Sequence, residues 1–231
     1  MNSDTTGDNG FDLSRVVLKL DDTDFSRIEG DCWTRFSFRI IQWSDSPQMF
    51  SDENLLKLGQ LEVLRLNSAI ALKSGESLFD IFSSMFSETL ECYEAIFDSN
   101  AHLRKPFRDE DSFNVSEDLI TDLHILNRIT IEEQFKGHGI TGEASSIYLE
   151  RFASRYDAYF VKAFPLQFEG DQNSPRDDYP RLFKGSFKSC QNKLSKYYER
   201  LGFRRIGKSP YFFGTVEDFF LRRRKLKAKS I

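Results

Sequence analysis

A glycine turn between a strand-like and a helix-like segment constrains this chain more than any other feature. The hexapeptide Gln-Phe-Lys-Gly-His-Gly at 134–139 follows the apolar run 123–131 and precedes 140–155, whose apolar residues recur at helical spacing. Glycine reaches positive φ and lets the backbone approach a ligand closely. The first N–H groups of a helix, together with the helix dipole, favour an anion. The order strand, turn, helix therefore predicts an anion-binding cradle.

A second motif, Tyr-Tyr-Glu-Arg-Leu-Gly-Phe, stands at 197–203. It ends a helix-like segment, 186–201, and Gly202 is placed to terminate that helix. The Gln-x-x-Gly-x-Gly pattern and the Tyr-Glu-Arg-Leu-Gly-Phe ending together resemble the pyrophosphate-binding and last-helix signatures of the GCN5-related N-acetyltransferases, which bind acetyl-coenzyme A. The Phe-Pro-Leu-Gln sequence at 164–167 is similar to an uncharacterised subgroup of that family.

The resemblance extends over about 123–223 and implies the acyl-CoA N-acyltransferase fold. That fold is of the α/β class (α+β, mixed sheet), with a central twisted mixed sheet, a splayed central strand and flanking helices. The first half of the chain is longer than the family's usual front half. We therefore expect a disordered tail at 1–10, a single acetyltransferase-like domain at 11–223 with an extended N-terminal half, and a basic tail at 224–231.

Periodicity predicts the individual elements. Alternating apolar residues favour strands, and apolar residues three and four positions apart favour helices. Ser77 is a suitable N-cap for a long helix in the first half. The strand–turn–helix–strand order implies two parallel neighbours, because parallel strands need a crossover connection. The predicted strands are 16–20, 33–43, 59–66, 122–131, 158–164 and a final antiparallel pair, 203–206 and 218–223; the predicted helices are 77–97, 140–155 and 186–201.

Carried onto these positions, the resemblance implies a site for acetyl-coenzyme A. The backbone of 129–131 would pair with the pantetheine amides. Residues 134–139 would wrap the pyrophosphate, with Lys136 neutralising a phosphate and Thr141 adding a hydroxyl. His138 stands where the family often has a small or aliphatic residue, and it would face solvent or the adenine nucleotide. The implied cofactor-binding residues are Ile129, Thr130, Ile131, Gln134, Phe135, Lys136, Gly137, His138, Gly139, Ile140, Thr141, Gln191 and Asn192.

Tyr198 matches the tyrosine that protonates the departing coenzyme A thiolate in many members of the family. A phenol with a pKa of about 10 is a competent donor when it lies within hydrogen-bond reach of the sulfur. The alternative is a core tyrosine on an amphipathic helix, and the neighbouring Tyr197 has no such match. For the general base the candidate is His124, although a histidine on a strand is more often a satisfied structural residue.

The leading interpretation is an enzyme that transfers an acetyl group from acetyl-coenzyme A to a primary amine. Two alternatives stay open: a catalytically inactive acyl-coenzyme A sensor or scaffold, and an acetyltransferase acting on an RNA-linked amine such as an aminoacyl-tRNA. The basic segment 222–229 alone supports a nucleic-acid partner, and the net charge of −4 argues against broad duplex binding. A homodimer is left open.

Composition argues against several other classes. Hydrophobic residues make up 39% of the chain, which is enough for a packed core. No apolar run reaches the length of a membrane span. The three cysteines and three histidines are scattered without metal-ligand spacing. We therefore expect reduced thiols, no metal site, no membrane partner and a cytoplasmic protein.

Overall fold

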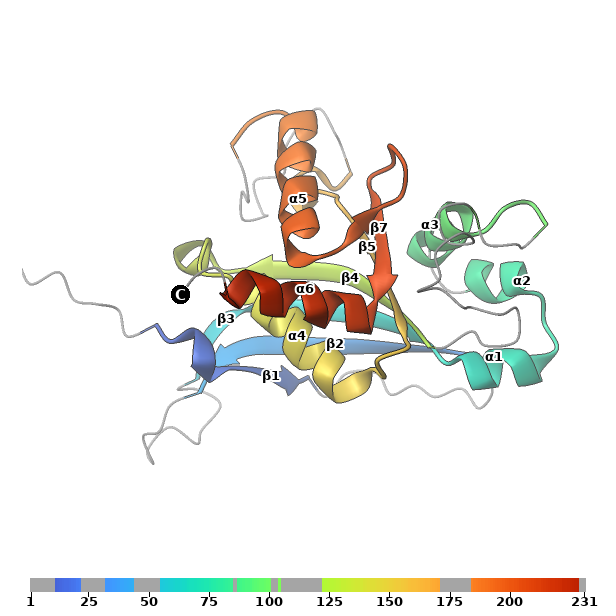
Figure 1. Ribbon diagram of the computed structural model, residues 1–231, viewed down its shortest axis with the longest axis horizontal. Coiled ribbons are helices and arrows are strands. Elements are labelled where there is room, and N and C mark those ends of the chain that lie inside the picture. The colour runs from blue at the N-terminus through green and yellow to red at the C-terminus, as the bar shows by residue number, and fades with distance from the viewer. Residues whose placement is uncertain are drawn as a thin grey trace, which may run out of the picture.

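Within the described residues, seven strands form one mixed sheet in the order β1-β2-β3-β4-β5-β7-β6 (Figure 1). The computed structural model describes residues 11–21, 32–43, 55–84, 87–100, 104, 122–170 and 184–228. Only β4 and β5 run parallel, and every other pairing is antiparallel. The strands are β1 (Val16–Leu20), β2 (Trp33–Gln42), β3 (Leu56–Leu66), β4 (Leu123–Ile131), β5 (Ala158–Lys162), β6 (Arg204–Arg205) and β7 (Tyr211–Thr215). The predicted mixed α/β architecture is confirmed.

Helices cover the sheet unevenly. In Figure 1 the helices α4 and α6 lie across one face, α5 stands beside the strand pair β5–β7, and α1–α3 gather at the right-hand end of the view. The helices are α1 (Ser68–Ser74), α2 (Leu78–Ser83), α3 (Ser87–Ile96), α4 (Ile140–Phe152), α5 (Phe187–Leu201) and α6 (Val216–Ala228), with short 3-10 turns η1 (Leu13–Arg15), η4 (Glu133–Phe135) and η5 (Leu166–Phe168). None of the helices in the described part of the chain is long and apolar enough to cross a membrane.

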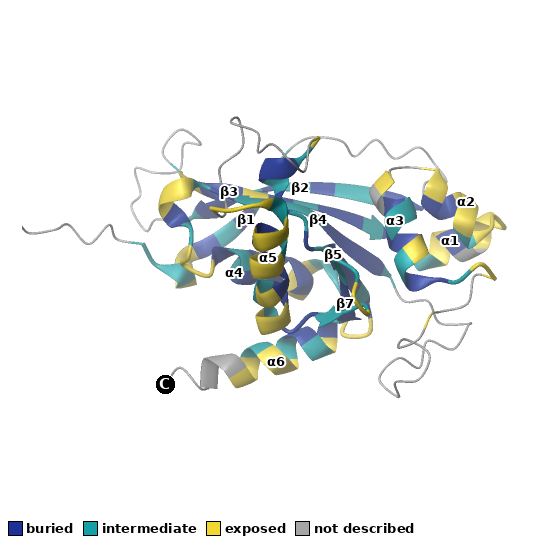
Figure 2. Cartoon of the chain, turned by 90° about the horizontal axis from the view of Figure 1, so that it is seen from above, coloured by how far each residue is buried: buried dark blue, intermediate teal, exposed yellow. Residues whose placement is uncertain are grey.

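Two hydrophobic cores lie on opposite faces of the sheet. Alternation along each strand separates them: Tyr159 and Val161 of β5 join the core beneath α4, α5 and α6, whereas Phe160 joins the core beneath α1–α3. Burial follows the same pattern in Figure 2, where the outer side of α5 is exposed and its inner side is not. The end of the sheet next to α1–α3 is therefore covered on both faces.

Local sequence signals account for most of the elements. The predicted strand 16–20 has the observed bounds, and those at 33–43, 59–66 and 158–164 overlap β2, β3 and β5. Helix α5 begins after Ser186, whose side chain accepts a hydrogen bond from Ser189 N. It ends at Gly202, which adopts φ 104°. The C-terminal role of Gly202 was predicted from its residue type, and the predicted helix 186–201 starts one residue before α5 because Ser186 is its N-cap.

The single helix predicted at 77–97 is wrong. Ser77 caps α2 as expected, but α2 ends at Ser83 and α3 begins at Ser87. On one straight helix, residues 82 and 93 would lie about 16 Å apart along the axis. Here the rings of Phe82 and Tyr93 approach to 5.6 Å between centroids. The chain breaks because folding α3 back on α2 buries both rings in the smaller core.

The predicted antiparallel pair of 203–206 with 218–223 is also wrong. The partner of β6 is β7, which lies between the two predicted strands in the chain. Residues 218–223 belong to α6, which Thr215 caps by accepting a hydrogen bond from Asp218 N at 3.1 Å. Val216 and Phe219, three positions apart, are buried by this helix in the larger core. The predicted basic tail is helical as far as Ala228, and the predicted disordered tail at 1–10 lies outside the described residues.

Close approach of β3 to β4 depends on Gly59. A Cβ at this position would lie 2.1 Å from the carbonyl oxygen of Thr130, a backbone atom on β4. We expect Gly59→Ala to lower the free energy of unfolding by about 1–3 kcal/mol, because β3 must move away from β4. Urea denaturation measures this, with Gln60→Ala at the next, exposed position as control. Equal stability of the two variants would contradict the prediction.

Candidate functional site

The strands β4 and β5 part after a short shared ladder. Their parallel register runs from Leu123 opposite Ala158 to Leu126 opposite Val161. Beyond it, β4 continues to Ile131 along β3, while β5 ends at Lys162. Where the two strands separate, β4 has a β-bulge relative to β3. Val63 faces Leu126 and Glu62 faces Arg128, so Asn127 is the extra residue on β4. Bulges bend a strand and increase its twist, which separates β4 from β5.

A cavity of about 630 Å³ opens where the two strands part. On its β5 side, the backbone of 127–131 has no strand partner within the described residues, so its N–H and C=O groups can bind a ligand. The lining residues come from five regions: Ser87 and Glu91 of α3; Ile125, Leu126, Asn127, Arg128, Ile129 and Ile131 of β4; Phe135, Lys136, Gly137, Gly139, Ile140 and Thr141 of the turn and α4; Phe160, Lys162, Phe164, Leu166 and Glu169 of β5 and the segment after it; Leu194, Tyr197, Tyr198 and Arg200 of α5.

The glycine turn forms one end of this cavity. A 3-10 turn over Glu133–Phe135 leads to Gly137 with φ 85° and to Gly139 with φ 78°, the N-cap of α4. Both angles lie in the left-handed region, which explains why glycine occupies these two positions. A Cβ on Gly137 would meet nothing within 4 Å, so the space beside this glycine is open. The N-terminus of α4 therefore faces the cavity with its first N–H groups.

Two cations stand at the same end. Lys136 is paired with Glu133, and its side chain is 17% exposed. The Arg200 guanidinium lies 5.9 Å from the ring centre of Tyr197. Both side chains line the cavity. The helix N-terminus, Lys136 and Arg200 together make this end of the cavity favourable for an anion.

Tyr197 and Tyr198 both line the cavity but differ in their hydroxyl partners. Hydrogen bonds from the Thr141 hydroxyl and the Gly142 N–H engage Tyr197, and although they act to lower its pKa, burial raises it overall. The hydroxyl of Tyr198 has no hydrogen-bond partner among the described residues. Burial also raises the pKa of Tyr198, so its phenol stays protonated at neutral pH. Tyr198 is thus the tyrosine whose hydroxyl is available to a molecule in the cavity.

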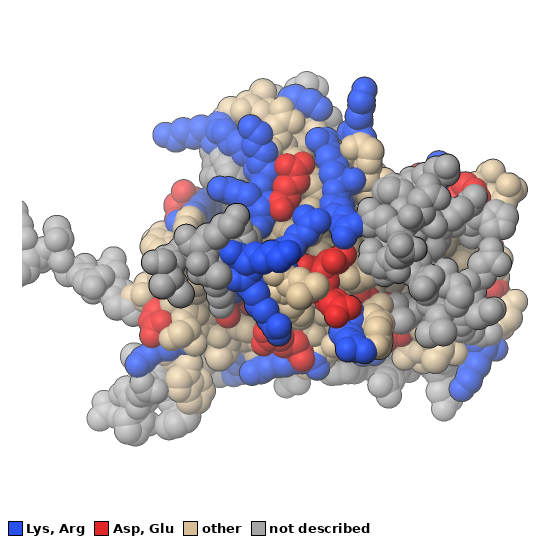
Figure 3. Space-filling model, viewed as in Figure 1, with Lys and Arg blue, Asp and Glu red and all other residues tan. Residues whose placement is uncertain are grey.

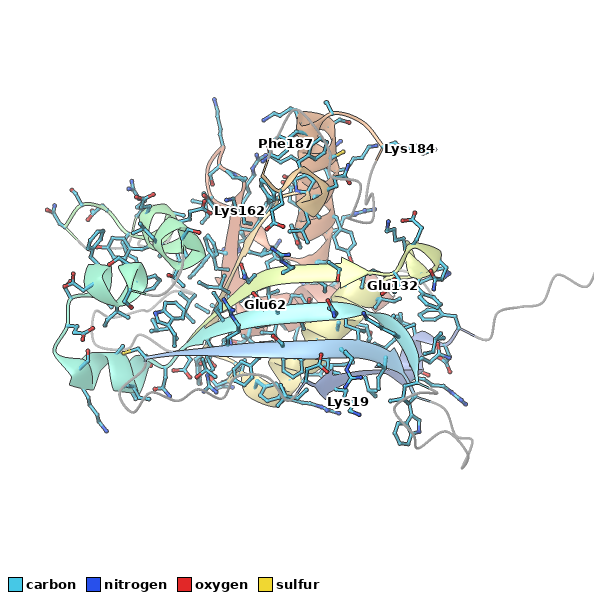
Figure 4. The ribbon with its side chains drawn as sticks, turned by 180° about the vertical axis from the view of Figure 1, so that it is seen from behind. Lys19, Glu62, Glu132, Lys162, Lys184 and Phe187 are labelled. Atoms are coloured by element: carbon cyan, nitrogen blue, oxygen red, sulfur yellow. The ribbon has the colours of Figure 1, made fainter. Side chains whose placement is uncertain are left out.

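The other end of the cavity carries charged residues that the sequence did not single out. Lys162 Nζ lies 2.5 Å from Glu91 Oε2, joining β5 to α3. Tyr211 also hydrogen-bonds Glu91, and burial together with that carboxylate raises the pKa of Tyr211 to about 12. Figure 4 shows Lys162 between the α2–α3 pair and α5. No local motif marks these residues, because three distant elements bring them together.

A second ion pair crosses the parting. Arg128 of β4 pairs with Glu169, which follows η5 after the end of β5. Beside it, Asn127 Nδ2 donates a hydrogen bond to Glu62 of β3 at 2.5 Å, which holds the bulge residue in place. The two carboxylates that line the cavity, Glu91 and Glu169, are therefore each paired with a cation that also lines it.

His124, the predicted base, does not line the cavity. It is fully buried, with Nδ1 2.9 Å from the Tyr148 hydroxyl and Nε2 3.0 Å from Asp157 Oδ2. Burial alone would raise the pKa of Asp157, but hydrogen bonds from His124 and Ser154 outweigh it and lower that pKa. Both ring nitrogens are thus used inside the core beneath α4. This placement suits a structural histidine rather than the predicted general base.

The predicted cofactor residues divide into two groups. The cavity is lined by Ile129, Ile131, Phe135, Lys136, Gly137, Gly139, Ile140 and Thr141. Five others do not line it: Thr130, Gln134, His138, Gln191 and Asn192. His138 is exposed, and its Nδ1 lies 3.1 Å from the carbonyl oxygen of Phe135. This contact stays within the exposed turn and does not reach the cavity.

No cluster of three or more histidine, cysteine, aspartate or glutamate side chains suited to a metal ion occurs in the described ranges.

Comparison with known proteins gives no match: neither a protein-family model, nor a curated protein, nor a solved structure matches the chain.

The buried His124 network should support the fold. Replacing His124 with Leu leaves the Tyr148 hydroxyl and the Asp157 carboxylate short of a partner, which typically costs about 1–3 kcal/mol for a buried polar group. We expect a lower melting temperature in differential scanning calorimetry. His138→Leu, at an exposed histidine, serves as the control and should change it little. A His124→Leu protein as stable as the wild type would argue against this structural role.

Proposed function

We propose that the protein transfers an acetyl group from acetyl-coenzyme A to a primary amine. The observation that carries the proposal is the cavity at the parting of β4 and β5. It joins an anion-favouring glycine turn at one end to an unengaged tyrosine hydroxyl and unpaired strand backbone beside it. A long ligand with phosphates at one end, amides in the middle and a thioester at the other suits this order of groups.

The arrangement of elements also supports an acyl-CoA N-acyltransferase fold. The central strand, the glycine turn, α4, the parallel strand β5 and then α5 follow each other in the order that the resemblance implies. One departure is clear. Helices α1–α3 lie between β3 and β4 in the sequence, and α3 contributes Ser87 and Glu91 to the lining of the cavity. We infer that this insertion shapes the acceptor side of the site.

In this proposal the pyrophosphate lies at the N-terminus of α4, with Lys136 and Arg200 balancing its charge. The free backbone of 127–131 pairs with the pantetheine amides, as a strand partner would. The acyl group then lies near the bulge at Asn127, where α3 and β5 close the cavity. Fixing the thioester there brings it within reach of an amine that enters from the side of Glu91 and Lys162.

The chemistry requires one proton to change places. The neutral amine nitrogen attacks the thioester carbon, the C–S bond breaks, and the amide forms while the nitrogen loses a proton. The departing thiolate must gain one, and the Tyr198 hydroxyl is the donor that the cavity offers. The proton lost by the nitrogen then restores the Tyr198 phenol through solvent, so amine and thioester become amide and free thiol with no net change in the protein. Burial raises the pKa of Tyr198, and it also raises the pKa of a thiol beside it. The apolar surroundings therefore do not by themselves prevent proton transfer from the Tyr198 hydroxyl to the thiolate.

Binding of acetyl-coenzyme A tests the first half of the proposal. Gly137→Glu places a carboxylate in the open space that the pyrophosphate would occupy, so we expect it to abolish the thermal shift produced by acetyl-coenzyme A. The matched control is Gly75→Glu. Gly75 also has positive φ, 71°, and open space around its Cβ, but it ends α1 away from the cavity. A full thermal shift in a folded Gly137→Glu protein would place the cofactor elsewhere.

Turnover tests the second half. Tyr198→Phe keeps the ring packed against Phe203 and Phe212 and removes only the hydroxyl. We expect kcat to fall by about 10²- to 10⁴-fold with a small change in the KM for acetyl-coenzyme A, measured by release of free thiol with a panel of amines.

Tyr197→Phe is the comparison, because its hydroxyl bonds to Thr141 and Gly142 and should affect cofactor binding more than kcat. Wild-type turnover in Tyr198→Phe with a crippled Tyr197→Phe would reassign the donor. Binding of acetyl-coenzyme A without transfer to any amine would instead favour a sensor or scaffold.

A further inference from the structure

Positive charge is concentrated in the last part of the chain. Residues 184–228 contain 13 lysines and arginines and three aspartates and glutamates, whereas the whole chain has 32 and 36. This part thus carries a surplus of ten cations in a protein whose formal net charge is −4. A charge asymmetry of this size within one chain indicates a polyanionic partner more readily than a generally soluble surface.

The fold brings these cations onto one side of the molecule. Helices α5 and α6 and the β6–β7 turn are consecutive in the chain and pack together, with Arg222 of α6 directly against Gly202 at the end of α5. Figure 3 shows lysines and arginines spread over this side, with few carboxylates between them. We call the exposed cationic side chains of α5, the β6–β7 turn and α6 the basic surface.

Ion pairing within the fold does not account for the basic surface. Two arginines beside the basic surface form ion pairs within the fold: Arg223 with Glu143, and Arg204 with Asp218. In contrast, Lys208, Arg224 and Lys225 are exposed and have no carboxylate partner in the part of the chain that the structure describes.

Helix electrostatics explains only some of these charges. Cations near the C-terminus of α6 are favoured by the helix dipole. Lys184 and Lys188 lie at the N-terminus of α5, where a cation is disfavoured. Lys196 and Arg200, four positions apart on α5, repel one another. Stability therefore does not explain why these positions are cationic.

We propose that the basic surface docks the phosphate backbone of a nucleic acid. Binding of this kind depends on the number of phosphates neutralised and needs no apolar anchor. Among positions 184–225, whose side-chain burial the structure describes, Leu221 at 47% exposed is the single large exposed hydrophobic residue, and one isolated side chain is no apolar anchor. A membrane surface or an acidic protein would be expected to use apolar side chains as well.

Coenzyme A does not explain the surface either. Arg200 lines the cavity, but Lys208, Arg224 and Lys225 do not. Each of α5 and α6 is about 20 Å long, so the basic surface extends well beyond the cavity mouth. The proposal is therefore independent of the acetyltransferase function. It makes the basic segment 222–228 one part of a larger surface rather than a separate tail.

Fluorescence anisotropy with a labelled RNA hairpin and a labelled DNA duplex tests the proposal on the full chain over a range of salt concentrations. We expect Lys208→Glu with Arg224→Glu to weaken binding on the order of tenfold and to flatten the dependence of log Kd on log salt. The control is Lys57→Glu with Lys73→Glu, which changes the net charge equally but lies on β3 and α1, outside the basic surface; because Lys57 pairs with Glu132, its melting temperature is measured as well. It should bind nearly as the wild type does.

Three results would overturn the proposal: wild-type protein that binds neither nucleic acid at about 0.15 M salt, equal weakening by both double variants, or surface-dependent binding only to vesicles of phosphatidylserine and phosphatidylcholine. If the charge-reversed protein fails to fold, Lys208→Gln with Arg224→Gln replaces it. The thermal shift with acetyl-coenzyme A on the same samples tests the other function separately.

Discussion

The partial pairing of β4 is the constraint on which the site depends. Along β3 this strand is paired to its end at Ile131, but along β5 only as far as Leu126. The extra residue Asn127, held to Glu62, bends the strand at that point. A fully paired sheet would leave no free backbone groups and no cavity. The space beside the glycine turn exists because the neighbouring strands separate before they reach it.

Packing on both faces makes this separation tolerable. In the segment where β4 and β5 are paired, Leu126 and Val161 pack into the larger core under α4, α5 and α6. On the other face, Ile125 and Phe160 pack into the smaller core under α1–α3. The two strands are thus fixed where they pair and part beyond it. The ion pairs Arg128–Glu169 and Lys162–Glu91 then line the opened region with charge that is balanced locally.

Charge at the cavity and charge on the basic surface follow different patterns. Near the cavity, carboxylates and cations occur in pairs between different elements, and their positions are fixed by those contacts. In the β6–β7 turn and α6, by contrast, Lys208, Arg224 and Lys225 are exposed and have no such partner in the described part of the chain. The first pattern suits a site that must orient a small molecule. The second suits attraction of a larger anion, which requires charge but little fixed geometry.

The sequence by itself determined the features that short-range physics controls. Period-two alternation located β1, β2 and β3, the apolar run at 158–164 located β5, and Gly202 marked the C-terminal end of α5. Gly137 and Gly139 indicated backbone positions with positive φ, and their location before a helix predicted the anion-favouring turn. Only the tertiary structure decided the break between α2 and α3, the helical state of 218–223, the burial of His124 and the meeting of Glu91 with Lys162. Each of these depends on contacts between residues far apart in the chain, such as Phe82 with Tyr93 or His124 with Asp157, which no local pattern encodes.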